Sequence, residues 1–377
     1  MKPVVRNQHY IPQTVLRHFA DAEEKLFETI FLGDEKKIFP TNVESTMSEN
    51  FTYEHNDLKQ NVVEDYFAAI EDKVGPKIKD VLIMIERIKK GEAVMSDAKE
   101  LIEELLNVFI TFYYRSGALL TEFSSIQKTD KIPLLSKKIL NYAYINALAD
   151  TIKNGYKFAI IESNDEFLLS DQYVSTAALA IKGNFPNVSN RHIGMKETIV
   201  LIPLSSRFYI VYWHTDAHFF IHQDTINSLT DEQIQLLNAC IVGNSYIKCV
   251  AKKKSSIESV IEKYESASPS QIYMGSKSGY MSGYILKKEV FLYDDDRKGF
   301  WILQPMNLSD YINLKVNDKC GCGSGKKFKK CHQNAFERIK PTVQNRSRRL
   351  PNGFFQIPGT GITELPIDEW GGFSSQN

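Results

Sequence analysis

The chain carries the stretch Asp318-Lys-Cys-Gly-Cys-Gly-Ser-Gly-Lys-Lys-Phe-Lys-Lys-Cys-His332 near its C-terminal end. Three of its five cysteines fall here, as Cys320, Cys322 and Cys331, and His332 follows the last of them directly. Thiolate and imidazole groups are the ligands that a structural zinc ion prefers, and four of them complete its tetrahedron. The stretch therefore predicts a zinc site with Cys320, Cys322, Cys331 and His332 as ligands.

The glycines between these cysteines suit the turn that such a site needs. Two cysteines one residue apart reach the same ion only if the backbone turns sharply, and Gly321, Gly323 and Gly325 tolerate positive φ. Phe328 is the only large apolar residue of the stretch, so burial of a core cannot fold it. Metal binding, at about 10–16 kcal/mol for structural zinc, is the usual substitute for a missing core.

A phosphate-binding P-loop is the other structure that a glycine-rich stretch could indicate. That loop needs four residues between its glycines, followed by lysine and then serine or threonine. Here only three residues separate Gly321 from Gly325, and Lys327 stands where the hydroxyl residue belongs. The pattern excludes a P-loop.

The string Cys-x-Cys-Gly-Ser-Gly-Lys-Lys-x-Lys-Lys-Cys-His, over residues 320–332, resembles the SEC-C motif. This motif is the zinc-binding tail of the SecA translocation ATPase and recurs at the ends of many bacterial proteins. In SecA the module contacts the SecB chaperone and the ribosome, and the resemblance implies a contact of one of these kinds. The chain has no Walker motif, so motor activity is not implied.

Length and composition describe an ordinary globular protein. A chain of 377 residues is long enough for two domains and a small appendage, and 43% hydrophobic with 24% charged residues is not a disordered composition. The N-terminus lacks the apolar core of a signal peptide, and no run approaches the roughly eighteen apolar residues that cross a bilayer. Since zinc thiolates need reducing conditions, we expect a cytoplasmic protein with Cys240 and Cys249 as buried free thiols.

The formal net charge is zero, but the charges are unevenly distributed. Residues 315–350 contain eleven Lys or Arg against Asp318 and Glu337, a surplus of nine that the rest of the chain balances. Such a cluster attracts phosphate backbones, which predicts contact with nucleic acid or the ribosome. The alternatives are a solvated basic face and an intramolecular contact with the acidic body. The candidate nucleic-acid-binding residues are Lys326, Lys327, Lys329, Lys330, Arg346, Arg348 and Arg349.

The N-terminal segment is the second distinctive stretch, reading Asn7-Gln-His-Tyr-Ile-Pro-Gln-Thr-Val-Leu-Arg-His-Phe-Ala20. Pro12 can occupy the first turn of a helix that buries Val15, Leu16 and Phe19. The His-Tyr-x-Pro-Gln string resembles the opening signature of the bacterial domain of unknown function 4238 family. The resemblance spans roughly residues 5–250 and carries no activity that could be transferred.

Members of that family continue with a Glu and an Arg in a helical region, then Phe-x-x-Ser-Asp and Pro-Leu-Ser segments. The matching positions here are Glu71, Arg115, residues 167–171 and residues 203–205. The chain departs from the family pattern after Asp171, because it has Gln172-Tyr173 where members usually have Asn-Pro. The loop at this point is therefore expected to differ.

The candidate catalytic residues are His9, Gln13, Glu71, Arg115 and Asp171. A histidine with two carboxylates could bind a second divalent ion and activate water, while an arginine stabilises phosphate charge, which suits a metal-dependent phosphodiesterase or nuclease. An arginine in so aromatic a helix needs a buried anion, which could be Glu71, Asp171 or a bound phosphate, and an ion pair is favoured. A serine hydrolase at Ser170 is disfavoured, since no Gly-x-Ser-x-Gly elbow is present.

Hydrophobic periodicity and turn residues predict an α+β fold, with a helical N-terminal half packed on an antiparallel sheet and a small C-terminal zinc knuckle. The expected helices cover residues 56–90 with a kink or split at Gly75-Pro76, 97–123, 134–154, 230–240 and 256–266. The expected hairpins cover residues 25–40, 156–169 and 198–213. The expected domains are a body over 1–310 (helical over 1–155, mainly sheet over 156–310), the knuckle over 316–335 and a basic, then Gly/Pro/aromatic tail over 336–377.

These features predict a zinc-binding cytosolic bacterial protein whose basic C-terminal module contacts nucleic acid or the ribosome. On this hypothesis the body acts there as a nuclease-like effector, and the family resemblance allows a role in defence against phage. The alternative is a non-catalytic module that binds a chaperone or another protein through the knuckle.

Overall fold

The structure is a computed structural model of the whole chain. It describes residues 3–30, 37–116, 132, 135, 142–179, 193, 198–216, 219–245, 248–265, 269–273, 284–288, 290–293, 313–321, 325–334, 336–337, 355–356 and 363–364. Within these ranges the protein is α+β, as the sequence predicts. None of the described helices combines the length and the apolar character that crossing a membrane requires.

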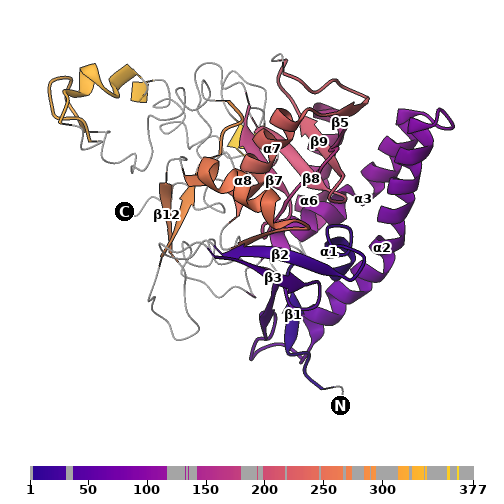
Figure 1. Cartoon of the computed structure of the whole chain (residues 1–377). Helices are drawn as coiled ribbons and strands as arrows, with labels where there is room; N and C mark the ends of the chain where they lie inside the picture. The colour runs from indigo at the N-terminus through magenta and orange to yellow at the C-terminus, as the bar shows by residue number, and fades with distance from the viewer. Residues whose placement is uncertain are drawn as a thin grey trace.

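The helices of the body lie around its two sheets. In Figure 1, α2 and α3 lie to the right of β5, β8 and β9, α7 and α8 lie to the left of these strands, and β2 and β3 lie below them. The described helices are α1 (Gln13–Leu16), α2 (Val62–Lys89), α3 (Met95–Arg115), α6 (Tyr142–Gly155), α7 (Asp231–Asn244) and α8 (Lys254–Glu265). The strands of the body are β1 (Asn7–His9), β2 (Lys25–Ile30), β3 (Lys37–Asn42), β4 (Ser48–Asn50), β5 (Lys157–Glu162), β6 (Leu169–Ser170), β7 (Ser175–Ala178), β8 (Thr198–Pro203), β9 (Phe208–Trp213), β10 (Ile226–Ser228) and β11 (Lys248–Ala251). Two further strand pairs are β12 (Pro269–Tyr273) with β13 (Tyr284–Lys288) and β14 (Phe355–Gln356) with β15 (Thr363–Glu364), and a 3-10 helix covers Phe328–Lys330. Strand β1 pairs with β4.

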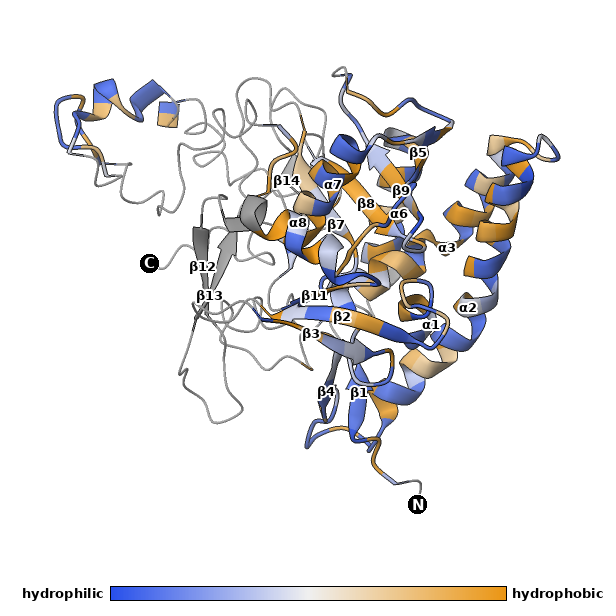
Figure 2. Ribbon diagram, in the orientation of Figure 1, coloured by the Kyte–Doolittle hydropathy of each residue, from blue (hydrophilic) through white to orange (hydrophobic). Residues whose placement is uncertain are grey.

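A five-stranded sheet in the order β10-β5-β9-β8-β7 forms the centre of the body. The hairpin predicted over residues 198–213 is confirmed, with Val200 opposite Tyr212. All residues of β8 and β9 are buried, as expected of strands covered on both faces, and β8 is largely orange in Figure 2. The sheet is not wholly antiparallel, because the edge strand β10 runs parallel to β5.

The hairpin predicted over residues 156–169 is wrong. Strand β5 pairs with β9 and β10, whereas β6 belongs to a second, four-stranded sheet in the order β3-β2-β11-β6. The turn residues between them direct the chain from one sheet to the other. The Glu166 carboxylate accepts hydrogen bonds from the backbone N–H groups of Lys252 and Lys253, both at 2.9 Å, and from the hydroxyl of Ser256 at the start of α8. A carboxylate at a helix N-terminus is stabilised by the unsatisfied N–H groups there, which fixes this crossing.

The long helix α2 is continuous through Pro76, so of the predicted kink or split at Gly75-Pro76 the split does not occur. Pro76 removes one hydrogen bond of the helix, but Val74 and Ile78 on either side are buried and hold the segment against the body. Gly75 allows close approach of α1, since a Cβ there would lie 3.3 Å from Cγ2 of Thr14. Helix α3 is shorter than predicted, because Ser116 already has an extended backbone with ψ of 126°.

A short segment beyond α8 packs against the five-stranded sheet. The backbone N–H of Ala178 in β7 donates to the carbonyl of Val290 at 3.0 Å, and the N–H of Leu292 donates back to Ala178 at 3.2 Å. Val290 and Leu292 are buried. The docking needs a glycine in α7, because a Cβ at Gly243 would lie 3.0 Å from Cγ2 of Val290.

This contact predicts the result of a double-mutant cycle. Alanine at Gly243 gains up to about 1 kcal/mol of helix propensity, but overpacking against Val290 costs about 1–3 kcal/mol. We expect Gly243→Ala to destabilise the body, and to become neutral or stabilising in a Val290→Ala background. Denaturant unfolding of the four proteins measures the coupling. An equal effect of Gly243→Ala in both backgrounds would show that Val290 does not pack there.

Candidate metal centre and buried polar cluster

The predicted zinc knuckle, described here over 313–321, 325–334 and 336–337, is held together by backbone hydrogen bonds. Cys320 N–H donates to the carbonyl of Lys326 at 2.7 Å, and Phe328 N–H donates to that of Asp318 at 2.8 Å. Gly325 has φ of +71°, as the turn requires. The ring of Phe328 lies 6.0 Å from that of Phe336, and both are buried. The small apolar centre thus has a second member just beyond the predicted segment.

The candidate ligands converge on one side of this centre. Sγ of Cys320 lies 3.1 Å and Sγ of Cys331 lies 3.0 Å from Nδ1 of His332. The ligand atoms of the three residues all lie within 4.8 Å of one another. Cys322 lies outside the described residues.

This arrangement fits a tetrahedral metal ion. With Zn–S at about 2.3 Å and Zn–N at about 2.0–2.1 Å, a sulfur and a nitrogen on one zinc ion lie roughly 3.6 Å apart. The observed separations of 3.0 and 3.1 Å are shorter than this value by about 0.5–0.6 Å. Burial lowers the pKa of His332, which favours the neutral imidazole that binds a metal. Two thiol sulfurs and one imidazole nitrogen in this geometry form a candidate metal site.

The lysines of the knuckle point into solvent around this site. Lys326, Lys327, Lys329 and Lys330 are all exposed, whereas Phe328 between them is buried. The short 3-10 helix Phe328–Lys330 produces this separation, because it turns one residue inward and its neighbours outward. The other candidate nucleic-acid-binding residues, Arg346, Arg348 and Arg349, lie outside the described residues.

The second candidate site surrounds a buried arginine in the body. Arg115, at the end of α3, is 1% exposed, and its guanidinium donates to the carboxylate of Glu71, to the carbonyl of His9 and, at 3.2 Å, to the hydroxyl of Tyr53. The guanidinium carbon lies 4.1 Å from the centre of the Phe67 ring. Burial alone would lower the pKa of Arg115, but Tyr53 and Glu71 raise it. The anion that the sequence requires is therefore Glu71, on α2.

His9 and Gln13 lie beside this ion pair. Nε2 of His9 donates to the carbonyl of Val43 at 3.1 Å, and Nδ1 lies 3.5 Å from the amide nitrogen of Gln13. This is the pattern of a neutral imidazole that donates from Nε2 and accepts at Nδ1. Burial is the main cause that lowers the pKa of His9, and Arg115 adds to it.

Comparison with known protein families finds matches to two separate segments of the chain. A family model described as a protein of unknown function, DUF4238, matches residues 7–256, and a SEC-C motif model matches residues 317–334. The chain belongs to the DUF4238 family. No curated protein and no solved structure matches it. The DUF4238 match contains every candidate catalytic residue, and the SEC-C match contains every candidate zinc ligand.

Asp171 has a different place in the DUF4238 body from His9 and Arg115. It is 1% exposed, its N–H donates to the carbonyl of Lys248 at 3.2 Å, and its carboxylate accepts from the N–H of Lys248 at 3.1 Å. Asp171 thus ties the end of β6 to the start of β11. Its charge reaches Tyr10, where it adds to the effect of burial in raising the pKa of the phenol.

The loop after Asp171 has a conformation that the usual Asn-Pro of the family could not adopt. Tyr173 has φ of +69°, whereas a proline ring locks φ near −65°. The hydroxyl of Tyr173 lies 3.5 Å from the carbonyl of Pro203, so the loop contacts the Pro-Leu-Ser segment. Ser170 is buried, and its hydroxyl accepts from the N–H of Gln172 at 3.1 Å, as a turn residue does.

The candidate catalytic residues do not converge as metal ligands. Among the described residues, groups of three His, Cys, Asp or Glu ligand atoms within 4.8 Å comprise only the knuckle set. His9, Glu71 and Asp171 are all described and form no such group. A second divalent ion held by a histidine and two carboxylates of the body is therefore not supported.

Glu64 is a member of the Arg115 cluster that the sequence did not single out. It precedes Glu71 by two turns of α2, so both carboxylates lie on the face that packs on α3. Its Oε2 is buried and has no hydrogen-bond partner among the described residues. Burial raises the pKa of Glu64, and Arg115 opposes this effect. In the sequence, Glu64 lies seven residues before Glu71, which predicts that the two carboxylates lie on one face of the helix. The same spacing also occurs on helix faces that are exposed to solvent, so it did not single out Glu64.

The lowered pKa of His9 predicts an acid-sensitive contribution to stability. An unfolded histidine titrates near pH 6.5, so below about that pH the unfolded chain takes up a proton that buried His9 resists. The free energy of unfolding should fall there by up to about 1.4 kcal/mol per pH unit. We expect His9→Gln to flatten this slope between pH 6.5 and the lower folded-state pKa. Denaturant unfolding at several pH values measures it, with His222→Gln as the control, because the His222 side chain is exposed. An unchanged slope in His9→Gln would contradict the assignment.

Proposed function

We propose that the SEC-C knuckle holds one zinc ion and uses the lysines around it to bind the phosphate backbone of nucleic acid, including ribosomal RNA. One observation carries the proposal. The ligand atoms of Cys320, Cys331 and His332 lie within 4.8 Å of one another, and the four lysines between these ligands are exposed. The metal would thus fix a compact array of positive charge.

The charge of the site itself leaves this array unneutralised. Three thiolates and a neutral imidazole around Zn²⁺ sum to about −1, against the surplus of nine positive charges over residues 315–350. Both aromatic rings of the described knuckle, Phe328 and Phe336, are buried, so they offer no platform for stacking a base. These features favour contacts to phosphate without sequence preference.

The Arg115 cluster supports a structural role better than a nuclease. Arg115 and Asp171 are each 1% exposed, and both are bonded to protein groups. A phosphodiester would have to displace Glu71 from Arg115 to use its charge. The body is therefore proposed as a scaffold that carries the knuckle.

The salt dependence of binding tests the proposal. Fluorescence anisotropy with a labelled RNA and a labelled DNA duplex gives log K against log salt, whose slope is about −0.7 to −0.9 per phosphate contacted. We expect replacement of Lys326, Lys327, Lys329 and Lys330 by glutamine to reduce the slope by up to about 3 and to weaken binding to every sequence equally.

A control variant removes the same number of charges from the body. Lys59, Lys73, Lys79 and Lys90 are also exposed, and their replacement by glutamine should leave the slope unchanged. Equal losses of affinity in the two variants would mean that binding depends on the net charge of the protein rather than on the lysines of the knuckle. Partner binding that survives high salt and nuclease treatment would instead support a protein partner.

A further inference from the structure

The two sulfur atoms of the described knuckle lie close enough to bond to each other. Sγ of Cys320 and Sγ of Cys331 are within 4.8 Å of one another, and both lie beside Nδ1 of His332. The sulfurs of a disulfide are about 2.05 Å apart, so a shift of less than about 3 Å would join them. Zinc holds its cysteine ligands as thiolates, which are the form of cysteine that reacts with oxidants. The pair of ligands is therefore also a candidate disulfide.

The two sulfurs differ in their access to solvent. Cys331 is partly exposed, whereas Cys320 is 4% exposed. A small oxidant dissolved in water therefore reaches Cys331 first, and Cys320 is the second thiolate within reach of it. The other described cysteines, Cys240 and Cys249, are buried in the body, and burial raises the pKa of the Cys249 thiol. Buried structural thiols of this kind are inert.

From these features we propose that the knuckle is a peroxide-sensitive switch, in which oxidation of Cys331 and closure of a Cys320–Cys331 disulfide release the metal. The disulfide removes two of the four predicted ligands, and the remaining two cannot complete a zinc tetrahedron. Only the buried rings of Phe328 and Phe336 would then hold the described knuckle together, so the fixed array of lysines is lost. Release of nucleic acid is the expected consequence, and this last step alone rests on the proposed function.

The oxidation consists of two displacements. The Cys331 thiolate attacks one oxygen of hydrogen peroxide, the O–O bond breaks, and hydroxide leaves as a sulfenic acid forms on Cys331. The Cys320 thiolate then attacks the sulfur of Cys331, the S–O bond breaks, and a second hydroxide leaves. Two protons from the solvent convert the hydroxides to water, and the two electrons that the sulfurs lose are gained by the peroxide. A dithiol reverses the change by thiol–disulfide exchange.

Treatment of the zinc-loaded full chain with a molar excess of hydrogen peroxide tests the switch. A chromogenic chelator measures the released zinc, mass spectrometry of proteolytic peptides identifies the disulfide, and dimedone traps the sulfenic acid. We expect zinc to be lost in step with formation of the Cys320–Cys331 disulfide, dimedone to label Cys331, and dithiothreitol with added zinc to restore the metal-bound protein. Fluorescence anisotropy with the labelled RNA should show an affinity at least about tenfold lower after oxidation.

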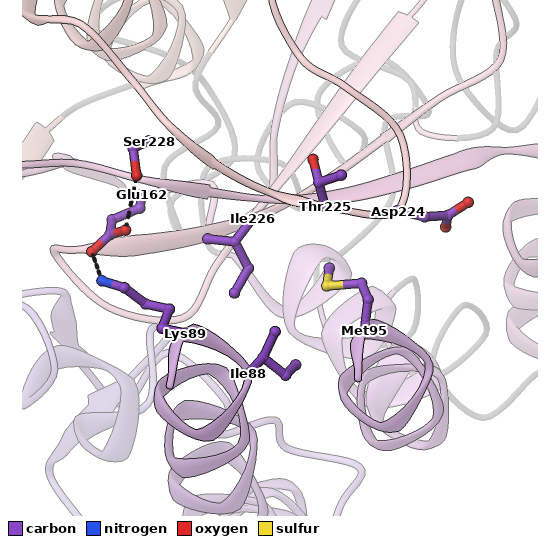
Figure 3. Close-up of a pocket in the computed structure, with 8 residues that line it drawn as sticks. All are labelled: Ile88, Lys89, Met95, Glu162, Asp224, Thr225, Ile226 and Ser228. Carbon is purple, nitrogen blue, oxygen red and sulfur yellow. Dashed lines mark hydrogen bonds and ion pairs between the residues drawn. The ribbon is translucent and has the colours of Figure 1, made fainter. Parts of the chain in front are cut away.

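A methionine of the body provides the control for oxidation outside the knuckle. Met95 is partly exposed, and Figure 3 shows its side chain directed into a crevice of about 350 Å³ that Ile88 and Ile226 also line. Peroxide converts such a thioether to a sulfoxide, which needs a dedicated reductase to reverse it. Met95→Leu and Cys240→Ala should each release zinc on oxidation as the native chain does.

Three outcomes would overturn the switch. They are zinc that stays bound while Met95 is oxidised, a disulfide that includes Cys322, and zinc loss that dithiothreitol cannot reverse, since the metal would then be retained or would leave by another reaction. The switch and the proposed function fail separately. Reversible zinc release through the Cys320–Cys331 disulfide in a chain that binds no nucleic acid would support the switch and contradict the proposed function alone.

Discussion

Cys331→Ser is expected to release the metal and unfold the SEC-C knuckle while the DUF4238 body stays folded. The knuckle buries only two large apolar side chains, Phe328 and Phe336, among its described residues, so a core cannot replace the metal. Structural zinc contributes about 10–16 kcal/mol of apparent binding free energy in such small modules. We therefore expect less than about a tenth of the native zinc content in this variant.

Metal analysis by mass spectrometry measures the zinc content, and limited proteolysis reports whether the knuckle is folded. Cys320→Ser and Cys322→Ser should behave in the same way, and the second of these tests the ligand that lies outside the described residues. Cys240→Ala is the matched control, since this thiol is buried in the body. A Cys331→Ser protein with full zinc content would contradict the ligand assignment.

Removal of the metal should also abolish nucleic-acid binding, because the four lysines would lose their fixed arrangement. A chelator is expected to reduce affinity as much as the four lysine substitutions do. Zinc content and binding are separate measurements. A chain that keeps its zinc but binds no nucleic acid would support the metal site and contradict the proposed function.

Glu71→Gln is expected to produce the largest loss of stability in the body. Arg115 is 1% exposed, whereas the Glu71 side chain is 18% exposed. The substitution leaves a guanidinium buried without its anion, and breaking a buried ion pair in this way costs about 3–5 kcal/mol. For a domain of this size that corresponds to a decrease in Tm of roughly 6–20 °C.

Substitution of the other member of the ion pair provides the comparison. In Arg115→Met the carboxylate left behind is partly exposed and can be hydrated, so the loss should be smaller than in Glu71→Gln. A double variant, with methionine at both positions, should recover part of the stability, because no unpaired charge remains. Tyr53→Phe removes the hydrogen bond that the charged guanidinium of Arg115 donates to the hydroxyl and should cost about 1.5–3 kcal/mol. A loss below about 1 kcal/mol in Glu71→Gln would mean that the carbonyl of His9 and the ring of Phe67 suffice for Arg115.

The parts of the fold that the sequence predicts correctly depend on local signals. The hairpin over residues 198–213 joins neighbouring strands, and the helix expected over 230–240 begins at a local capping box formed by Thr230 and Gln233. The knuckle is also local, since Cys320 and His332 are only twelve residues apart. In each case the residue types and their spacing were sufficient to predict the local structure.

The errors concern partners that are distant in the chain. The turn residues Ser163-Asn-Asp165 are typical of a hairpin, but Glu166 is bonded to Lys252 and Lys253, and β10 adds to β5 from more than sixty residues away. For Arg115 the sequence required an anion without specifying it, because Glu71 and Asp171 are equivalent until α2 and α3 pack together. Glu64 was missed because its burial depends on the same packing.

The docking of Val290 and Leu292 on β7 lies beyond residue 256, where the DUF4238 match ends. A chain that ended at that boundary would expose the outer edge of β7 and the surface of α7 at Gly243, where Val290 packs. Uncovered strand edges of this kind join between molecules and aggregate. Soluble preparation of the isolated body should therefore require the chain to continue through residue 293, past the end of the family match.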